Sequence, residues 1–170
     1  MCYFCIRKLF FGNNSKKEKE SVIYMENIIK ELNQFLADLN VFYRKLQNYH
    51  WNIEGKEFFV IHSKLEEYYD EINKSIDEVA EFILTKNEEP LGTMKDYLEI
   101  TQITEAQNQK VKCDVVFNEL IKDFSYLLKN AKAIKKEAEK VEDEATSTFM
   151  DEFIADYSKK LWMLNQTMSH

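Results

Sequence analysis

The sequence contains few residues that interrupt regular secondary structure. Among its 170 residues there are only three glycines and one proline, whereas a β-rich protein needs both types at its many turns. An all-α protein with few connections can do without them. The chain is long enough for one well-buried core and too short for two full domains. We therefore expect one helical domain.

Cysteines are also few. Cys2, Cys5 and Cys113 are the three in the chain, and an odd number with two at the N-terminus does not resemble the disulfide framework of a secreted domain. The pattern favours a reducing cytoplasm. Cys2 and Cys5 have no second Cys or His pair nearby to complete four metal ligands, so we assign them no metal site.

Long apolar runs are absent, and none approaches the roughly 20 residues of a membrane-spanning helix. This predicts a cytoplasmic protein without a membrane partner. The net charge of −7 is unevenly distributed along the chain. Residues 1–24 contain five basic and two acidic side chains and so carry +3, whereas residues 25–170 carry −10. Any contact with DNA is expected from this basic segment.

Residues 1–24 show little periodicity and contain a Gly-Asn-Asn-Ser stretch followed by a run of mixed charge. This composition predicts a flexible N-terminal extension, with residues 25–170 as the folded domain. Regular helical patterning begins at Met25, so translation starting at Met25 is an alternative. The sequence leaves both open.

Apolar residues at three- and four-residue steps predict a first helix from Met25 to about Trp51. After an interruption at residues 52–55, a second stripe runs from Phe58 to Ile83. Because the break is so short, the two helices should form an antiparallel hairpin.

The pattern then lapses over residues 86–104, where one short helix is expected at 93–98. Two more helical stripes follow, one through Val111 to Leu128 and one through Phe149 to Leu164, and they divide at about residues 140–144. Two hairpins joined by one long crossover give a ferritin-like four-helix bundle.

Candidate metal ligands lie around the first hairpin. His50 and His62 flank its turn, Glu66 lies one turn beyond His62, and Asp77 and Glu81 are one turn apart farther along the second helix. At about 100° per residue, the four side chains of the second helix fall within an arc of roughly 100°. They share one broad face.

One chain cannot place all these residues on one ion. His62 and Asp77 are about 22 Å apart along a helix axis, whereas metal ligands approach to about 2 Å. A twofold axis crossing the second helix near its middle would set the Asp77 end of one subunit against the His50 end of another. Mixed imidazole and carboxylate ligands favour iron over structural zinc.

Each residue also has a plainer interpretation. A His beside Trp51 is often a hydrogen-bonded core residue, and an acidic pair on a helix is usually solvated. Aromatic residues such as Tyr69 are more simply explained as core and interface packing, although Trp51 could intercept oxidising radicals. The combination carries more weight than any single residue.

Several separated motifs resemble the signature of the Dps family, the mini-ferritins. They are Tyr49-His50-Trp51-Asn52-Ile53, His62 twelve residues after His50, Ile76-Asp77-Glu78-Val79-Ala80-Glu81, Leu91-Gly92-Thr93 with Tyr97-Leu98, and Asp143-x-x-Thr146 with Lys160-Leu161-Trp162-Met163-Leu164. The resemblance covers the chain from Met25 to its C-terminus.

This resemblance implies a hollow shell of twelve subunits with ferroxidase sites at twofold interfaces. His50 and His62 of one chain would bind iron together with Asp77 and Glu81 of its neighbour, and Glu66 would assist. It implies oxidation of Fe(II), preferably by hydrogen peroxide, and storage of ferric mineral inside the shell. In the family, Arg commonly follows Ala-Glu, and Phe82 stands there instead. This departure could alter an ion pair at the interface or the route by which iron enters.

Two other functions stay open. The protein could act mainly as a DNA-compacting scaffold through Arg7, Lys8, Lys16, Lys17 and Lys19, or as a helical bundle without a metal site. Larger ferritins carry Glu-x-x-His on core helices, but Gln47 and Phe59 stand three residues before the two histidines. This difference favours the interface site.

Overall fold

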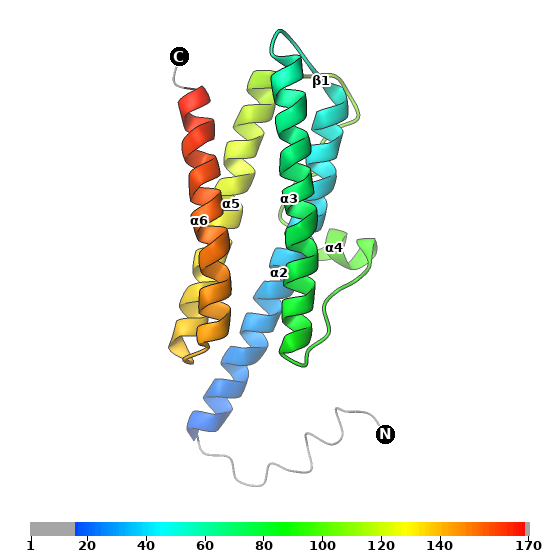
Figure 1. The fold of residues 1–170 in the computed structure, drawn as a ribbon. Helices are drawn as coiled ribbons and strands as arrows, with labels where there is room; N and C mark the ends of the chain where they lie inside the picture. The colour runs from blue at the N-terminus through cyan, green and yellow to red at the C-terminus, as the bar shows by residue number, and fades with distance from the viewer. Residues whose placement is uncertain (1–15, 169–170) are drawn as a thin grey trace.

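The computed structural model describes residues 16–168, with side chains from residue 23 onward. Four long helices form a bundle, and a short helix lies in the connection between its halves (Figure 1). In chain order the elements are α2 (Lys16–Asn52), β1 (Ile53–Glu54), α3 (Phe58–Thr85), α4 (Met94–Ile100), β2 (Val111–Lys112), α5 (Cys113–Lys140) and α6 (Glu144–Thr167). The predicted ferritin-like bundle with its long crossover is confirmed.

Two predicted boundaries were wrong. Helix α2 begins at Lys16 instead of Met25, because good helix formers such as Lys and Glu extend the helix beyond its apolar stripe. Val111 belongs to β2 instead of the third helix, since it pairs in parallel with Ile53. Residues 1–15 of the predicted extension lie outside the described part, so the division between residues 24 and 25 stays a prediction.

The core lies along the inward face of each long helix, as the apolar stripes predicted. Phe42 and Phe124 meet edge to face with ring centroids 5.0 Å apart, and Phe35 meets Phe153 in the same way at 5.2 Å. Burying such a side chain contributes about 1.5–3 kcal/mol. Over residues 16–168, no helix is both long and apolar enough to cross a membrane.

Two buried lysines connect neighbouring helices. Lys45 of α2 lies 2.8 Å from Glu119 and 2.6 Å from Asp123, both on α5. Lys160 of α6 lies 2.6 Å from Glu71 of α3. Because a buried ammonium needs carboxylate partners, these contacts define how the two hairpins pack against each other.

The crossover is fastened along α2 and just beyond its end. Its hydrogen bonds reach successive positions from Asn33 onward, so the segment follows the C-terminal half of the helix. In order along α2 the contacts are Leu91 N to Asn33 Oδ1 (2.8 Å), Thr101 Oγ1 and Gln102 N to Asp38 Oδ1 (2.8 Å each), Asn48 Nδ2 to Asn108 Oδ1 (2.9 Å), and the parallel pairing of β1 with β2.

Asp143 caps the N-terminus of α6 and joins it to α3. Its carboxylate accepts hydrogen bonds from the backbone N–H of Thr146 at 3.2 Å and from the Thr146 hydroxyl at 2.6 Å. Lys86 Nζ lies 2.7 Å from Asp143 Oδ1. Burial alone would raise the pKa of Asp143, but the bonds from Lys86 and Thr146 outweigh it and lower the pKa below its ordinary value.

Asp143→Ala should therefore lower the free energy of unfolding by about 2–3 kcal/mol. Loss of the helix cap accounts for about 1 kcal/mol of this. The rest arises because the mostly buried Lys86 is left without its carboxylate partner. Because the folded pKa is lowered, this stabilisation is present above the unfolded pKa of about 3.9 and disappears as pH falls through the folded pKa. Urea unfolding at neutral and acidic pH measures the difference. Exposed Glu152→Ala is the control, and an equal loss at all pH values would contradict the assignment.

Candidate functional site

His50 and His62 form a reciprocal pair at the turn between α2 and α3. The Nδ1 atom of His50 lies 2.8 Å from the backbone oxygen of His62, and the Nδ1 atom of His62 lies 2.9 Å from the backbone oxygen of His50. Their rings stack with centroids 3.7 Å apart and planes at 20°. The turn therefore brings the two predicted ligands together.

These hydrogen bonds determine which nitrogen of each ring is free. A carbonyl oxygen only accepts hydrogen bonds, so Nδ1 of each neutral histidine carries the proton and Nε2 retains its lone pair. The ring of Phe58 stacks on His62 with centroids 4.9 Å apart and limits the movement of the imidazole. Backbone acceptors on Nδ1 are the usual arrangement of metal-binding histidines, so Nε2 is the atom of each ring that remains for a metal.

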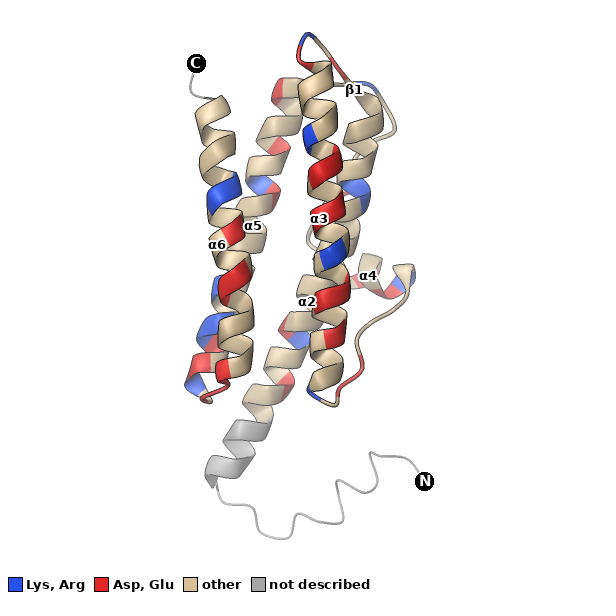
Figure 2. Cartoon of the chain, in the orientation of Figure 1, with Lys and Arg blue, Asp and Glu red and all other residues tan. Residues whose placement is uncertain are grey.

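The predicted carboxylates are distributed along α3, as Figure 2 shows for its acidic residues. Glu66 lies one turn from His62, whereas Asp77 and Glu81 lie toward the other end of the helix, and all three are exposed. Within residues 16–168 of one chain, no group of three or more His, Cys, Asp or Glu residues could hold a metal ion. The described part of one chain therefore brings the two histidines together but not the three carboxylates.

Tyr69 is a neighbour of the histidines that the sequence had assigned only to packing. Its ring meets His50 edge to face, with centroids 5.4 Å apart and planes at 89°. Its hydroxyl donates a hydrogen bond to Glu66 Oε1 at 3.2 Å. Only the three-residue spacing from Glu66 could have indicated this contact from the sequence.

Phe82, at the position where the resemblance led us to expect arginine, packs against α6 of the same chain. Its ring stacks on Phe149 of α6 with centroids 4.2 Å apart and planes at 18°. The Nζ atom of Lys86 lies 5.1 Å from the centre of the same ring. The contact between α3 and α6 at this position is therefore apolar.

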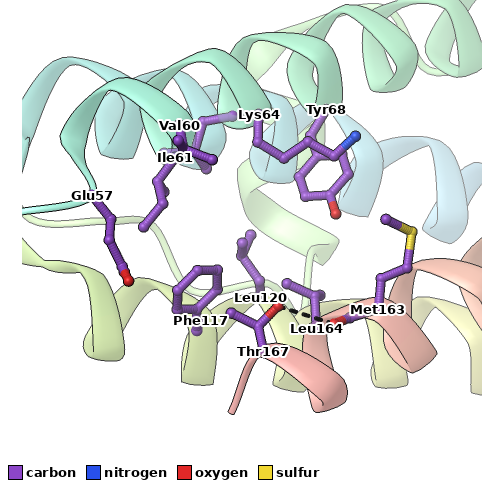
Figure 3. Close-up of a pocket in the computed structure, with 11 residues that line it drawn as sticks. Glu57, Val60, Ile61, Lys64, Tyr68, Phe117, Leu120, Met163, Leu164 and Thr167 are labelled. Carbon is purple, nitrogen blue, oxygen red and sulfur yellow. Dashed lines mark hydrogen bonds between the residues drawn. The ribbon is translucent and has the colours of Figure 1, made fainter.

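An apolar cavity of about 300 Å³ lies between α3, α5 and α6 (Figure 3). Side chains such as Ile61, Phe117 and Met163 converge on it, and neither His50 nor His62 lines it. Two of the side chains that line it, Val60 and Met163, are also exposed, at 74% and 41%. Contiguous exposed apolar side chains are common at protein interfaces.

Comparisons with known proteins point to one family. Residues 29–170 match the model described as Ferritin-like domain. The chain is 37% identical over 139 residues to DNA protection during starvation protein 2 of Bacillus anthracis, covering 82% of this chain and 94% of that protein. It is 32% identical over 133 residues to DNA protection during starvation protein of Helicobacter pylori strain J99, covering 78% and 92%.

Solved structures agree in fold. A DPS protein from Vibrio cholerae O1, described as a member of a broad superfamily of ferritin-like diiron-carboxylate proteins, matches with a TM-score of 0.83 and 37% identity over 86% of this chain and 92% of that chain. Antigen TpF1 from Treponema pallidum matches with a TM-score of 0.84 and 31% identity over 86% and 94%.

Proposed function

Because the chain belongs to the Dps family of ferritin-like proteins, we propose that it oxidises and stores iron as one subunit of a hollow twelve-subunit shell. Its substrates are Fe(II) and, preferably, hydrogen peroxide. The product is a ferric mineral kept inside the shell. The protein would thereby act as a ferroxidase that protects the cell against oxidative damage.

The observation that carries this proposal is the reciprocal hydrogen bonding of His50 and His62. It holds both rings in the tautomer with a free Nε2, so that no rearrangement is needed before they bind a cation. Asp77 and Glu81 of a neighbouring subunit supply oxygen ligands and negative charge, and Glu66 assists from the histidine side. Nitrogen and oxygen donors together suit Fe(II).

The split site requires two antiparallel copies of α3 at a twofold axis. Such an axis, crossing α3 between His62 and Asp77, places each histidine pair beside the carboxylates of the other chain. Trp51 and Phe59 at the same end of the bundle are 56% and 83% exposed. Burying large apolar side chains of this kind favours assembly.

In the proposed reaction, hydrogen peroxide takes up two protons and two electrons, one from each of two Fe(II) ions, and gives two water molecules. No hydroxyl radical is released. The side chains hold Fe(II) where this transfer occurs, and the closed shell retains the ferric product. Anaerobic oxidation of Fe(II) by added peroxide, compared with a His50→Ala/Asp77→Ala variant, tests the proposal.

A second candidate function is DNA compaction, with iron oxidation secondary or absent. It is favoured by the five basic residues within positions 1–24 and by the names of the Bacillus and Helicobacter relatives. Against it stands the charge of −10 on residues 25–170, which repels phosphate.

If the N-terminal residues bind DNA, removing residues 1–24 should abolish binding, because twelve weakly basic segments on one shell act together. Binding by the full chain should weaken by about 10³-fold or more between roughly 50 and 200 mM salt. Gel-shift titration of both proteins at two salt concentrations measures this. Equal affinity after deletion would exclude the N-terminal segment as the binding element.

A further inference from the structure

Tyr69 links the two sides of the candidate iron site within one subunit. From α3 its hydroxyl holds Glu66 Oε1 at 3.2 Å, and its ring packs edge to face against His50 of α2 at 5.4 Å. Tyr69 is therefore placed to couple the positions of Glu66 and His50.

The ring of Tyr69 is itself supported from α2. It meets the ring of Tyr43 edge to face, with centroids 6.1 Å apart and planes at 85°. The hydroxyl of Tyr43 accepts a hydrogen bond from Gln47 Nε2 at 2.9 Å. Contacts on two sides of the Tyr69 ring keep its hydroxyl at a defined position above α3.

We propose that Tyr69 is a positioning residue of the iron site, which holds the Glu66 carboxylate as a further ligand beside His50 and His62. The inference rests on the proposed function and specifies how that site is prepared. Tyr69 acts through Glu66 and does not itself bind iron.

Glu66 needs such a partner because it is exposed and has a flexible side chain. A free glutamate at the surface occupies many rotamers, and ordering it costs up to about 2 kcal/mol. The bond from Tyr69 selects rotamers before iron arrives, so less of this entropy is lost on binding. The phenol of tyrosine is protonated at neutral pH, so the Tyr69 hydroxyl is able to donate this bond.

Loss of a positioning residue should weaken metal binding, whereas loss of a structural residue should lower the stability of the fold. The bond from Tyr69 to Glu66 lies at the surface, and a hydrogen bond of this kind contributes at most about 1 kcal/mol to folding. Tyr69→Phe keeps the ring that packs on His50 and removes only the hydroxyl. It should leave the melting temperature close to that of the parent and weaken metal binding.

The test uses the assembled full-length protein and Co(II), a probe that binds without being oxidised by the anaerobic solution. Calorimetry and the Co(II) absorption spectrum should show binding weakened about 10-fold in Tyr69→Phe, the lower end of what loss of an outer partner costs. Tyr97→Phe is the matched control, because it removes a hydroxyl that donates to Leu91 O at 2.8 Å away from the site. Its Co(II) binding should equal that of the parent.

A double variant separates the routes by which Tyr69 could act. If it acts through Glu66, adding Tyr69→Phe to Glu66→Ala should weaken Co(II) binding no further. Parent-like binding by Tyr69→Phe, or a full additional loss in the double variant, would overturn the inference and leave the iron site standing. Parent-like binding by His50→Ala/Asp77→Ala would instead overturn the proposed function itself.

Discussion

Replacing His50 and Asp77 together with alanine should reduce Fe(II) oxidation by hydrogen peroxide to the rate of iron in buffer, while the subunits still assemble. The variant removes one ligand from each side of the proposed interface site. The loss should exceed the roughly 10- to 100-fold that removal of an outer partner of a metal ligand costs. Anaerobic stopped-flow absorbance of the ferric product measures the rate. The control is Glu26→Ala/Glu152→Ala, which removes two exposed carboxylates that lie on α2 and α6, away from the ligand face of α3.

Shells assembled from two different single variants test more directly whether the site is shared between chains. Each single variant, His50→Ala or Asp77→Ala, should be inactive alone because every site lacks one ligand. Dissociating and reassembling an equal mixture should restore roughly a quarter of the sites, since half of the dimers are mixed and each mixed dimer has one intact site. Recovery of activity would support a site shared between chains. Fast oxidation by either single variant, or none by the parent, would contradict it.

Asp38→Ala should destabilise the protein by about 3–5 kcal/mol, the range for breaking a buried, fully hydrogen-bonded charged group. Asp38 is fully buried. Its carboxylate accepts from the side chains of Gln34 (3.2 Å), Thr101 (2.8 Å) and Tyr126 (2.9 Å) and from the backbone N–H of Gln102 (2.8 Å). Truncation leaves these donors without their acceptor.

Urea unfolding measures this loss, and exposed Glu26→Ala on the same helix is the control, with an expected change within about 0.5 kcal/mol. Hydrogen exchange should also speed up at Gln102 N in Asp38→Ala. A loss below about 1 kcal/mol would mean that water replaces the carboxylate. In that case Asp38 would not hold the crossover in place.

Periodic apolar residues predicted the four long helices and the crossover, because packing selects one face of every helix. The His50 and His62 pair was also predictable, since a short turn brings both ends of a hairpin together. Their reciprocal bonds to each other's carbonyl oxygens were not, because sequence spacing does not specify ring orientation.

Other features depended on contacts between distant segments. The Asp38 carboxylate accepts hydrogen bonds from Thr101 and Tyr126. Sixty or more residues separate Asp38 from each of them, so no local sequence pattern predicts the cluster. Val111 was predicted to be helical but lies in a strand, because it pairs with Ile53, which is also distant in the sequence. Tyr69 looked like packing because aromatic residues are common in cores, and its hydroxyl bond appears only in three dimensions.

The fastening of the crossover along α2 also sets a limit on its length. Each of the three anchors, Asn33, Asp38 and Asn48, holds one or two crossover residues against one turn of the helix. Adding or deleting a single residue between anchors would shift the following backbone by about 3.3–3.6 Å, enough to separate every later donor from its acceptor. Natural variants of this chain should therefore change length at their termini, whereas the crossover should keep its residue count across evolution.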